Sequence, residues 1–91
     1  MEYPSRSWDW SLEIYDRFGS RIVAEDYIYY LKDAESTMKD WFVKCPPRSQ
    51  AWIYKRSKHG DMGEIKVWYT DDSGVICRQK KGQEIEFEEE E

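Results

Sequence analysis

The chain has 91 residues, 40% of them hydrophobic and 16% aromatic, and its formal net charge is −5. This length predicts one domain, and the five Trp and seven Tyr can supply much of its buried apolar area. No apolar run approaches the roughly 18 residues of a membrane-spanning helix, and the first residues lack the features of a signal peptide. We therefore expect a cytoplasmic protein with no membrane partner.

The charges are segregated along the chain. Residues 1–43 carry nine acids and five bases, whereas residues 44–83 carry nine bases and four acids. Residues 84–91 hold six glutamates and no base. This pattern predicts a single domain over 1–83 followed by an acidic tail, 84–91, that is partly disordered.

The first half of the chain predicts a hairpin. Trp8, Trp10, Leu12 and Ile14 alternate with polar residues, which indicates a half-buried strand over 8–16. A turn closed by Gly19 follows. Residues 20–31 are rich in β-branched and aromatic types, yet their apolar residues also fit helical spacing. We favour a strand with a bulge near Glu25 and Asp26, where the alternation breaks.

A helix is predicted next. Asp33 is a good N-cap residue, and one apolar stripe at helical spacing follows it, made of Ala34, Met38, Trp41 and Phe42. The sequence Cys45-Pro46-Pro47 is expected to end the helix.

Three antiparallel strands should then cover 51–56, 64–70 and 75–79, with the last two joined by a turn that ends in Gly74. The middle strand alternates Ile65, Val67 and Tyr69 with polar residues and Trp68. The fold class is therefore α+β: an antiparallel sheet of four to five strands with one helix packed on one face, in the order ββαβββ.

Catalytic and metal-binding motifs are weak in this sequence. The single histidine, His59, lies in a polar loop with two glycines, and no cysteine or histidine pair has the short spacing of a zinc site. We expect Cys45 and Cys77 to be reduced thiols, with a disulfide as the alternative. The sequence thus predicts no cofactor, no metal and no enzymatic activity.

Aromatic and basic residues interleave in the last three strands. If Ile53, Ile65 and Val67 faced the helix, the remaining rings would lie together on the opposite face with bases around them. The predicted binding residues are Trp52, Tyr54, Arg56, Trp68, Lys66, Arg78, Lys80 and Lys81. The alternatives for these rings are burial under the N-terminal hairpin and pairing with a second copy of the chain as a homodimer.

Three function classes follow from these observations. The first is a small non-enzymatic domain that binds a protein, such as an acidic inhibitor of a basic nucleic-acid-handling enzyme. The second is single-stranded nucleic-acid binding through the aromatic and basic sheet face. The third is an uncharacterised enzyme.

Overall fold

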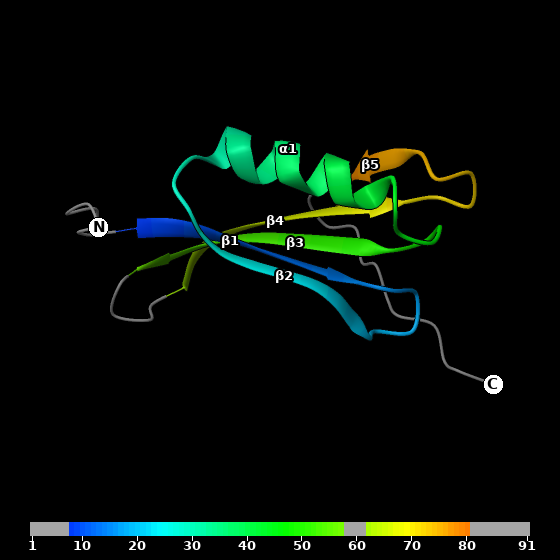
Figure 1. The fold of residues 1–91 in the computed structure, drawn as a ribbon, viewed down its shortest axis with the longest axis horizontal. Coiled ribbons are helices and arrows are strands. Elements are labelled where there is room, and N and C mark those ends of the chain that lie inside the picture. The colour runs from blue at the N-terminus through cyan, green and yellow to red at the C-terminus, as the bar shows by residue number, and fades with distance from the viewer. Residues whose placement is uncertain (1–7, 58–61, 81–91) are drawn as a thin grey trace.

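The computed structural model describes residues 8–57 and 62–80, which form one antiparallel sheet of five strands and one helix in the predicted ββαβββ order. Loop residues 58–61 and the predicted tail, 84–91, lie outside the described residues, as does the predicted domain end at residue 83. The elements are β1 Trp8–Tyr15, β2 Arg21–Ile28, α1 Leu31–Phe42, β3 Gln50–Ser57, β4 Met62–Thr70 and β5 Ile76–Arg78. The strands lie side by side in the order β2-β1-β3-β4-β5 (Figure 1).

Two turns of the same design join β1 to β2 and β4 to β5. The carboxylate Oδ1 of Asp16 accepts from two backbone N–H groups, and that of Asp71 does the same, each bond being 2.9 Å long. Gly19 and Gly74 close the turns with φ of 91° and 81°, a region that favours glycine. The predicted turns are therefore confirmed.

Residues 21–28 form a strand and not a helix. The pairing of β2 with β1 shifts by one residue between the pairs Trp10–Ile28 and Leu12–Glu25, so a bulge lies where the alternation breaks. Tyr27 sits in this bulge with a φ of 62°, an uncommon value for a residue with a side chain. The preferred strand prediction for 20–31 is therefore confirmed over 21–28, whereas Leu31 already belongs to the helix.

Helix α1 begins earlier than predicted. Its N-cap is Tyr30, which supplies no side-chain cap, and Asp33 lies inside the first turn, so the predicted Asp33 cap is wrong. The negative charge of Asp33 in this turn still stabilises the helix, because it lies near the positive end of the helix dipole. No helix in the described part of the chain is long and apolar enough to cross a membrane.

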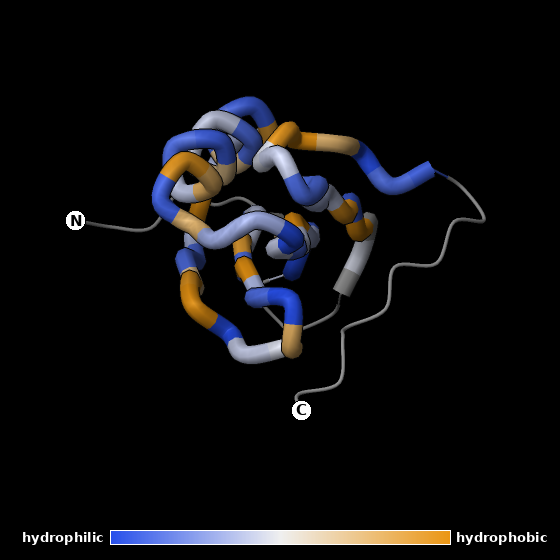
Figure 2. The backbone as a smooth tube through the Cα atoms, turned by 90° about the vertical axis from the view of Figure 1, so that its right-hand side faces the viewer, coloured by the Kyte–Doolittle hydropathy of each residue, from blue (hydrophilic) through white to orange (hydrophobic). Residues whose placement is uncertain are grey.

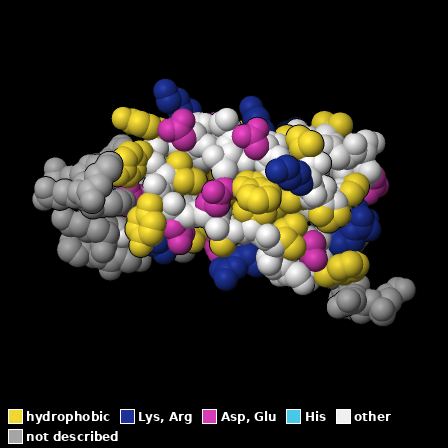
Figure 3. Space-filling view, viewed as in Figure 1, with side chains coloured by type: hydrophobic (Ala, Val, Ile, Leu, Met, Phe, Trp, Pro, Cys, Tyr) yellow, Lys and Arg dark blue, Asp and Glu magenta, His cyan; other side chains and the backbone are white. Residues whose placement is uncertain are grey.

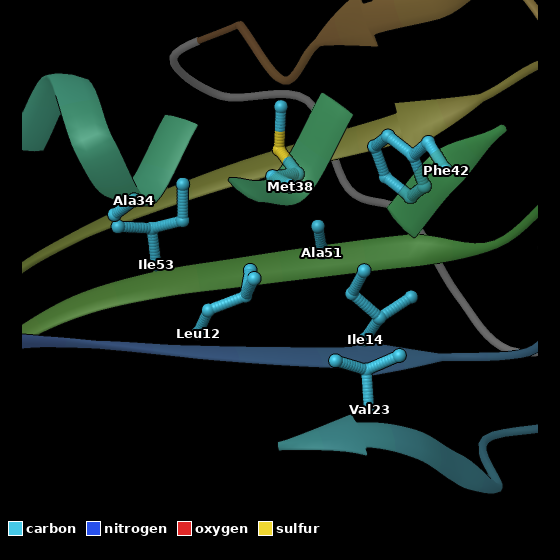
Figure 4. Close-up of a cluster of buried hydrophobic side chains, with 8 residues drawn as sticks. All are labelled: Leu12, Ile14, Val23, Ala34, Met38, Phe42, Ala51 and Ile53. Atoms are coloured by element: carbon cyan, nitrogen blue, oxygen red, sulfur yellow. The ribbon is translucent and has the colours of Figure 1, made fainter. Parts of the chain in front are cut away.

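The core lies between the helix and one side of the sheet (Figures 1 and 2). In the close-up of Figure 4, the three buried helix residues point toward side chains from β1, β2 and β3. The buried cluster consists of Leu12, Ile14, Val23, Ala34, Met38, Phe42, Ala51 and Ile53. The predicted helix stripe is confirmed, with Trp41 packed against this cluster and donating from Nε1 to Glu25 Oε2 at 2.6 Å.

The predicted faces of β4 are wrong. Residues directly opposite each other in an antiparallel pair lie on the same side of the sheet. Ala51 and Ile53 face the helix, and their partners in β4 are Trp68 and Lys66. Ile65, Val67 and Tyr69 therefore lie on the side away from the helix.

Cys45 and Cys77 are not bonded to each other, as predicted. Both thiols are half-buried. Burial raises the pKa of Cys45, which packs against the core, so this thiol is a poor nucleophile at neutral pH.

The face assignment predicts different costs for the same substitution at two isoleucines. Ile53 is fully buried and Ile65 is 44% exposed on the neighbouring strand. Ile53→Ala should lower the free energy of unfolding by about 2–5 kcal/mol, because it leaves a cavity under the helix. Ile65→Ala should cost about 1 kcal/mol or less. Urea unfolding of both variants measures the difference, and equal losses would contradict the assignment of Ile53 and Ile65 to opposite faces.

Candidate binding surfaces

The structure divides the predicted binding residues between two sides of the sheet. Trp52, Tyr54 and Arg56 lie on the side without the helix. Lys66, Trp68 and Arg78 lie on the helix side, because Lys66 is opposite Ile53 and Trp68 is opposite both Ala51 and Arg78. Lys80 is exposed after β5, and Lys81 lies outside the described residues. The single platform predicted from the sequence is therefore wrong.

The side without the helix, which we call the open face, is built from three rows across β1, β3 and β4. The pairing places Tyr15 opposite Gln50 and Gln50 opposite Tyr69. The second row is Glu13, Trp52 and Val67, and the third is Ser11, Tyr54 and Ile65. Four large rings and two aliphatic side chains thus lie together on one side of neighbouring strands.

Glu13 is the electrostatic centre of the open face. Its carboxylate Oε2 accepts from Tyr15 Oη at 3.3 Å and from Arg21 at 3.2 Å, and its side chain is 18% exposed. Burial, and after it the negative charge of Glu13, raises the pKa of Tyr15 and of Tyr54. Both phenols are therefore neutral donors at physiological pH, and neither is activated as a base or nucleophile.

Each row also contains a buried polar atom that has no hydrogen-bond partner among the described residues. These atoms are Ser11 Oγ, Gln50 Oε1 and Trp52 Nε1. Ser11 and Gln50 are only 1% and 3% exposed. Buried polar groups in native proteins are rarely left unpaired, because each costs about 1–3 kcal/mol. The middle of the open face thus combines apolar rings with unused hydrogen-bonding capacity.

The charges of the open face are mixed and slightly acidic. Asp9 lies in β1 opposite Arg56, and Arg56 approaches Asp26 of β2 at 3.7 Å. With the pair of Glu13 and Arg21, this gives three carboxylates against two guanidinium groups. Of the described bases that the sequence prediction placed around the rings, only Arg56 lies on this face.

Two of the predicted bases, Lys66 and Arg78, lie on the helix side with Lys55, and we call these three residues the basic strip. Helix α1 packs mainly on β1, β2 and β3, so the helix side of β4 and β5 lies at its flank. Lys66 is diagonal to Lys55 across β3 and β4, and Arg78 is diagonal to Lys66 across β4 and β5. Diagonal neighbours in a sheet are about 7–8 Å apart. Each neighbouring pair repels by about 0.5 kcal/mol in water.

The indole rings beside the basic strip are already covered. Lys55 Nζ lies 5.8 Å from the centre of the Trp10 ring, and the Arg78 guanidinium lies 5.2 Å from that of Trp68. Both rings also pack against the core. The strip therefore offers ordered positive charge and no bare aromatic ring on which a base could stack.

The sequence prediction missed Glu13, Tyr15, Ile65, Val67 and Tyr69 as members of a surface. A period of two gives the two sides of each strand, but the side that joins the core depends on pairing register. The sequence between β3 and β4 offers no two-residue turn motif from which their register could be predicted. One feature of the sequence could have assigned the sides of β3. Ile53 is apolar and belongs in the core, so its neighbour Trp52 must face away from the helix.

Neutralising Glu13 should change how the tyrosines of the open face titrate. In Glu13→Gln the pKa of Tyr15 and of Tyr54 should fall, because the negative charge that raises both is gone. Both values should stay above the ordinary value of about 10, because burial is the larger cause. Absorbance of the tyrosinate form measures the titration, with Glu35→Gln on the helix as the control.

The same change has a defined effect on stability at high pH. The folded pKa values are raised, so this contribution to stability is fully present below about pH 10 and is lost as pH rises through the folded values. Glu13→Gln should make that loss smaller in urea unfolding. An unchanged tyrosine titration in Glu13→Gln would contradict the electrostatic role of this carboxylate.

The chain matches no protein-family model, no curated protein and no solved structure. Its function must therefore be inferred from the open face and the basic strip themselves.

Proposed function

We propose that this protein is a non-enzymatic binding module that takes a protein partner on the open face of its sheet. The observation that supports this proposal is the three-row surface of Trp52, Tyr54, Tyr69, Val67 and Ile65 opposite the only helix of the described chain. An apolar surface of this kind, with polar groups at its margin, commonly marks an interaction site.

The residue types favour a protein as the partner. Trp, Tyr and Arg are enriched at protein interfaces and carry most of their binding energy. The open face presents all three, together with polar atoms that a partner's backbone could satisfy after small side-chain movements. On the side seen in Figure 3, which carries α1 and is not the open face, hydrophobic side chains lie between acidic and basic ones.

The charges favour a partner with a basic surface. Asp9, Glu13 and Asp26 outnumber the two guanidinium groups on the open face, and the whole chain carries −5. Such a charge speeds association with a positively charged protein at low salt. A basic nucleic-acid-handling enzyme that this chain inhibits is a partner with that chemistry.

Single-stranded nucleic-acid binding is the second candidate, and the basic strip is the observation that favours it. A nucleic acid would meet the cations of Lys55, Lys66 and Arg78 there. It would find no bare ring, since Trp10 and Trp68 are covered by Lys55 and Arg78. The ring of Trp52, which no described cation covers, lies on the other side of the sheet beside carboxylates. Because stacking and phosphate contacts are separated, we rank this function second.

Two neighbouring residues of β4 provide a matched test. Val67 lies on the open face and Lys66 on the helix side, so Asp at either position probes one surface from the same strand. Val67→Asp should reduce partner affinity by at least tenfold, since it places a carboxylate in the middle of the interface. It should not unfold the domain, because Val67 is only half-buried. Lys66→Asp should leave the affinity nearly unchanged.

The measurement is affinity capture from an extract of the source organism, with and without nuclease, using the wild-type chain and both variants. Circular dichroism of both variants checks folding. Capture that resists nuclease and is lost only in Val67→Asp supports the proposal. The loss would then come from the changed surface and not from charge, because the added carboxylate would attract a basic partner. Capture lost in Lys66→Asp and abolished by nuclease would support the second candidate. If the chain forms a dimer and Val67→Asp dissociates it, the open face binds a second copy of the chain and not a different protein.

A further inference from the structure

We infer that the partner of the open face contributes an arginine side chain, whose guanidinium stacks on the ring of Trp52 and pairs with the carboxylate of Glu13. This inference rests on the proposed function, because it names the chemical group by which a protein partner is recognised. Trp52 and Glu13 lie directly opposite each other on β3 and β1. The Cβ atoms of such a pair are about 4.5–5.5 Å apart, so one incoming group can contact both side chains.

Trp52 occupies the centre of the three-row surface. Glu13 and Val67 are its partners on the two neighbouring strands, and Gln50 and Tyr54 precede and follow it on the same side of β3. Trp52 is half-buried, so its neighbours hold the side chain while part of it stays accessible. Tryptophans at the centre of an interface often carry a large share of the binding energy.

Three other tryptophans show which group an indole ring of this protein accepts. A cation lies over each ring, at 5.4, 5.8 and 5.2 Å from its centre, in the pairs Lys44 with Trp41, Lys55 with Trp10, and Arg78 with Trp68. The shortest of these three distances belongs to the arginine. Indole is the most favourable aromatic ring for a cation. No described cation lies over Trp52, so this ring fits a cation that the partner supplies.

The carboxylate of Glu13 provides the second contact. It accepts from Tyr15 Oη at 3.3 Å and from Arg21 Nη1 at 3.2 Å, both at Oε2, and both distances are long for hydrogen bonds of their kinds. The Arg21 side chain is 58% exposed, so water weakens this ion pair. A carboxylate has about four acceptor positions on its two oxygens. A second guanidinium can therefore bind Glu13 without displacing Arg21.

The combination of a ring and a carboxylate selects arginine over lysine. A guanidinium is planar, so it lies flat on an indole while its N–H groups point outward in the plane of the group. It can therefore stack on Trp52 and donate to Glu13 at the same time. An ammonium group is more strongly hydrated and has no flat face, so the same position costs it more water and gives it less contact.

The first test uses the full chain and three peptides of the form acetyl-Gly-Gly-X-Gly-Gly-amide, in which X is arginine, lysine or citrulline. Citrulline has nearly the shape of arginine but no charge. The indole N–H signals of Trp52, Trp10 and Trp68 are followed by NMR as each peptide is added. The arginine peptide should shift the Trp52 signal most and bind at least about threefold more tightly than the lysine peptide. The citrulline peptide should give no saturable shift.

Two variants identify the contacts. Glu13→Gln and Trp52→Leu should each weaken binding of the arginine peptide by about threefold or more. Glu35→Gln on the helix and Phe18→Leu in the first turn remove the same charge and an aromatic ring elsewhere, and should leave binding unchanged. The backbone N–H signal of Val67 replaces the indole signal in Trp52→Leu. Circular dichroism checks folding, and Glu13→Gln decides the outcome if Trp52→Leu does not fold.

Equal binding of the arginine and citrulline peptides, or of the arginine and lysine peptides, would overturn the inference, as would unchanged binding in Glu13→Gln. Affinity capture separates this result from the proposed function. Capture that is lost in Val67→Asp but kept in Glu13→Gln would leave the protein partner in place and overturn the arginine contact. Selective binding of the arginine peptide at Trp52, with no protein captured from the extract, would support the contact and contradict the proposed function.

Discussion

The pairing register between β3 and β4 determines both surfaces of this protein. Ala51 and Ile53 must face the helix because they fill the core, and the residues opposite them are carried to the same side. Trp68 and Lys66 therefore flank the helix, while Val67 is turned outward. A slip of one residue would exchange every side chain of β4 between the two sides. The separation of aromatic and basic residues follows from this one alignment.

The width of a single helix is the second constraint. A helix with its side chains is about 10–12 Å across, whereas five strands spaced by about 4.8 Å span roughly 20 Å. One helix of 12 residues can thus cover three strands of this sheet on one side and none on the other. The flank over β4 and β5 and the whole open face are left for other uses. Two binding surfaces are consequently compatible with one small core.

The sequence alone predicted the order and nature of the elements, because each carries its own local signal. The alternation in β1, the helical stripe from Ala34 to Phe42, and the two Asp and Gly turns all match the structure. The position of the helix start could not be found in this way, since Tyr30 caps it through its backbone and Asp33 is an equally good residue for the first turn.

The candidate site was predicted only in part. Trp52, Tyr54 and Arg56 were placed together correctly, because the buried Ile53 between Trp52 and Tyr54 fixes the side of β3. For β4 the more apolar alternation of Ile65, Val67 and Tyr69 suggested the core side. The core instead accepts Trp68, since a large amphipathic side chain can cover apolar surface at the edge of a helix. Hydrophobicity of a strand face is therefore weaker evidence of burial than its pairing with a strand of known orientation.

Among the described side chains, cation stacking distinguishes three tryptophans that pack on the core from Trp52. Lys44, Lys55 and Arg78 lie over the rings of Trp41, Trp10 and Trp68, all of which also pack on the core. No described cation covers Trp52. The indole N–H groups of Trp52 and Trp68 both lack a hydrogen-bond partner in the described chain. Alternating basic and aromatic residues in this sequence thus indicate stacking within the fold as much as binding of a ligand. The surface that no described cation covers is neutral and aromatic and lies beside carboxylates. A protein can complement its apolar, hydrogen-bonding and acidic parts together. A polyanion would be repelled by the carboxylates.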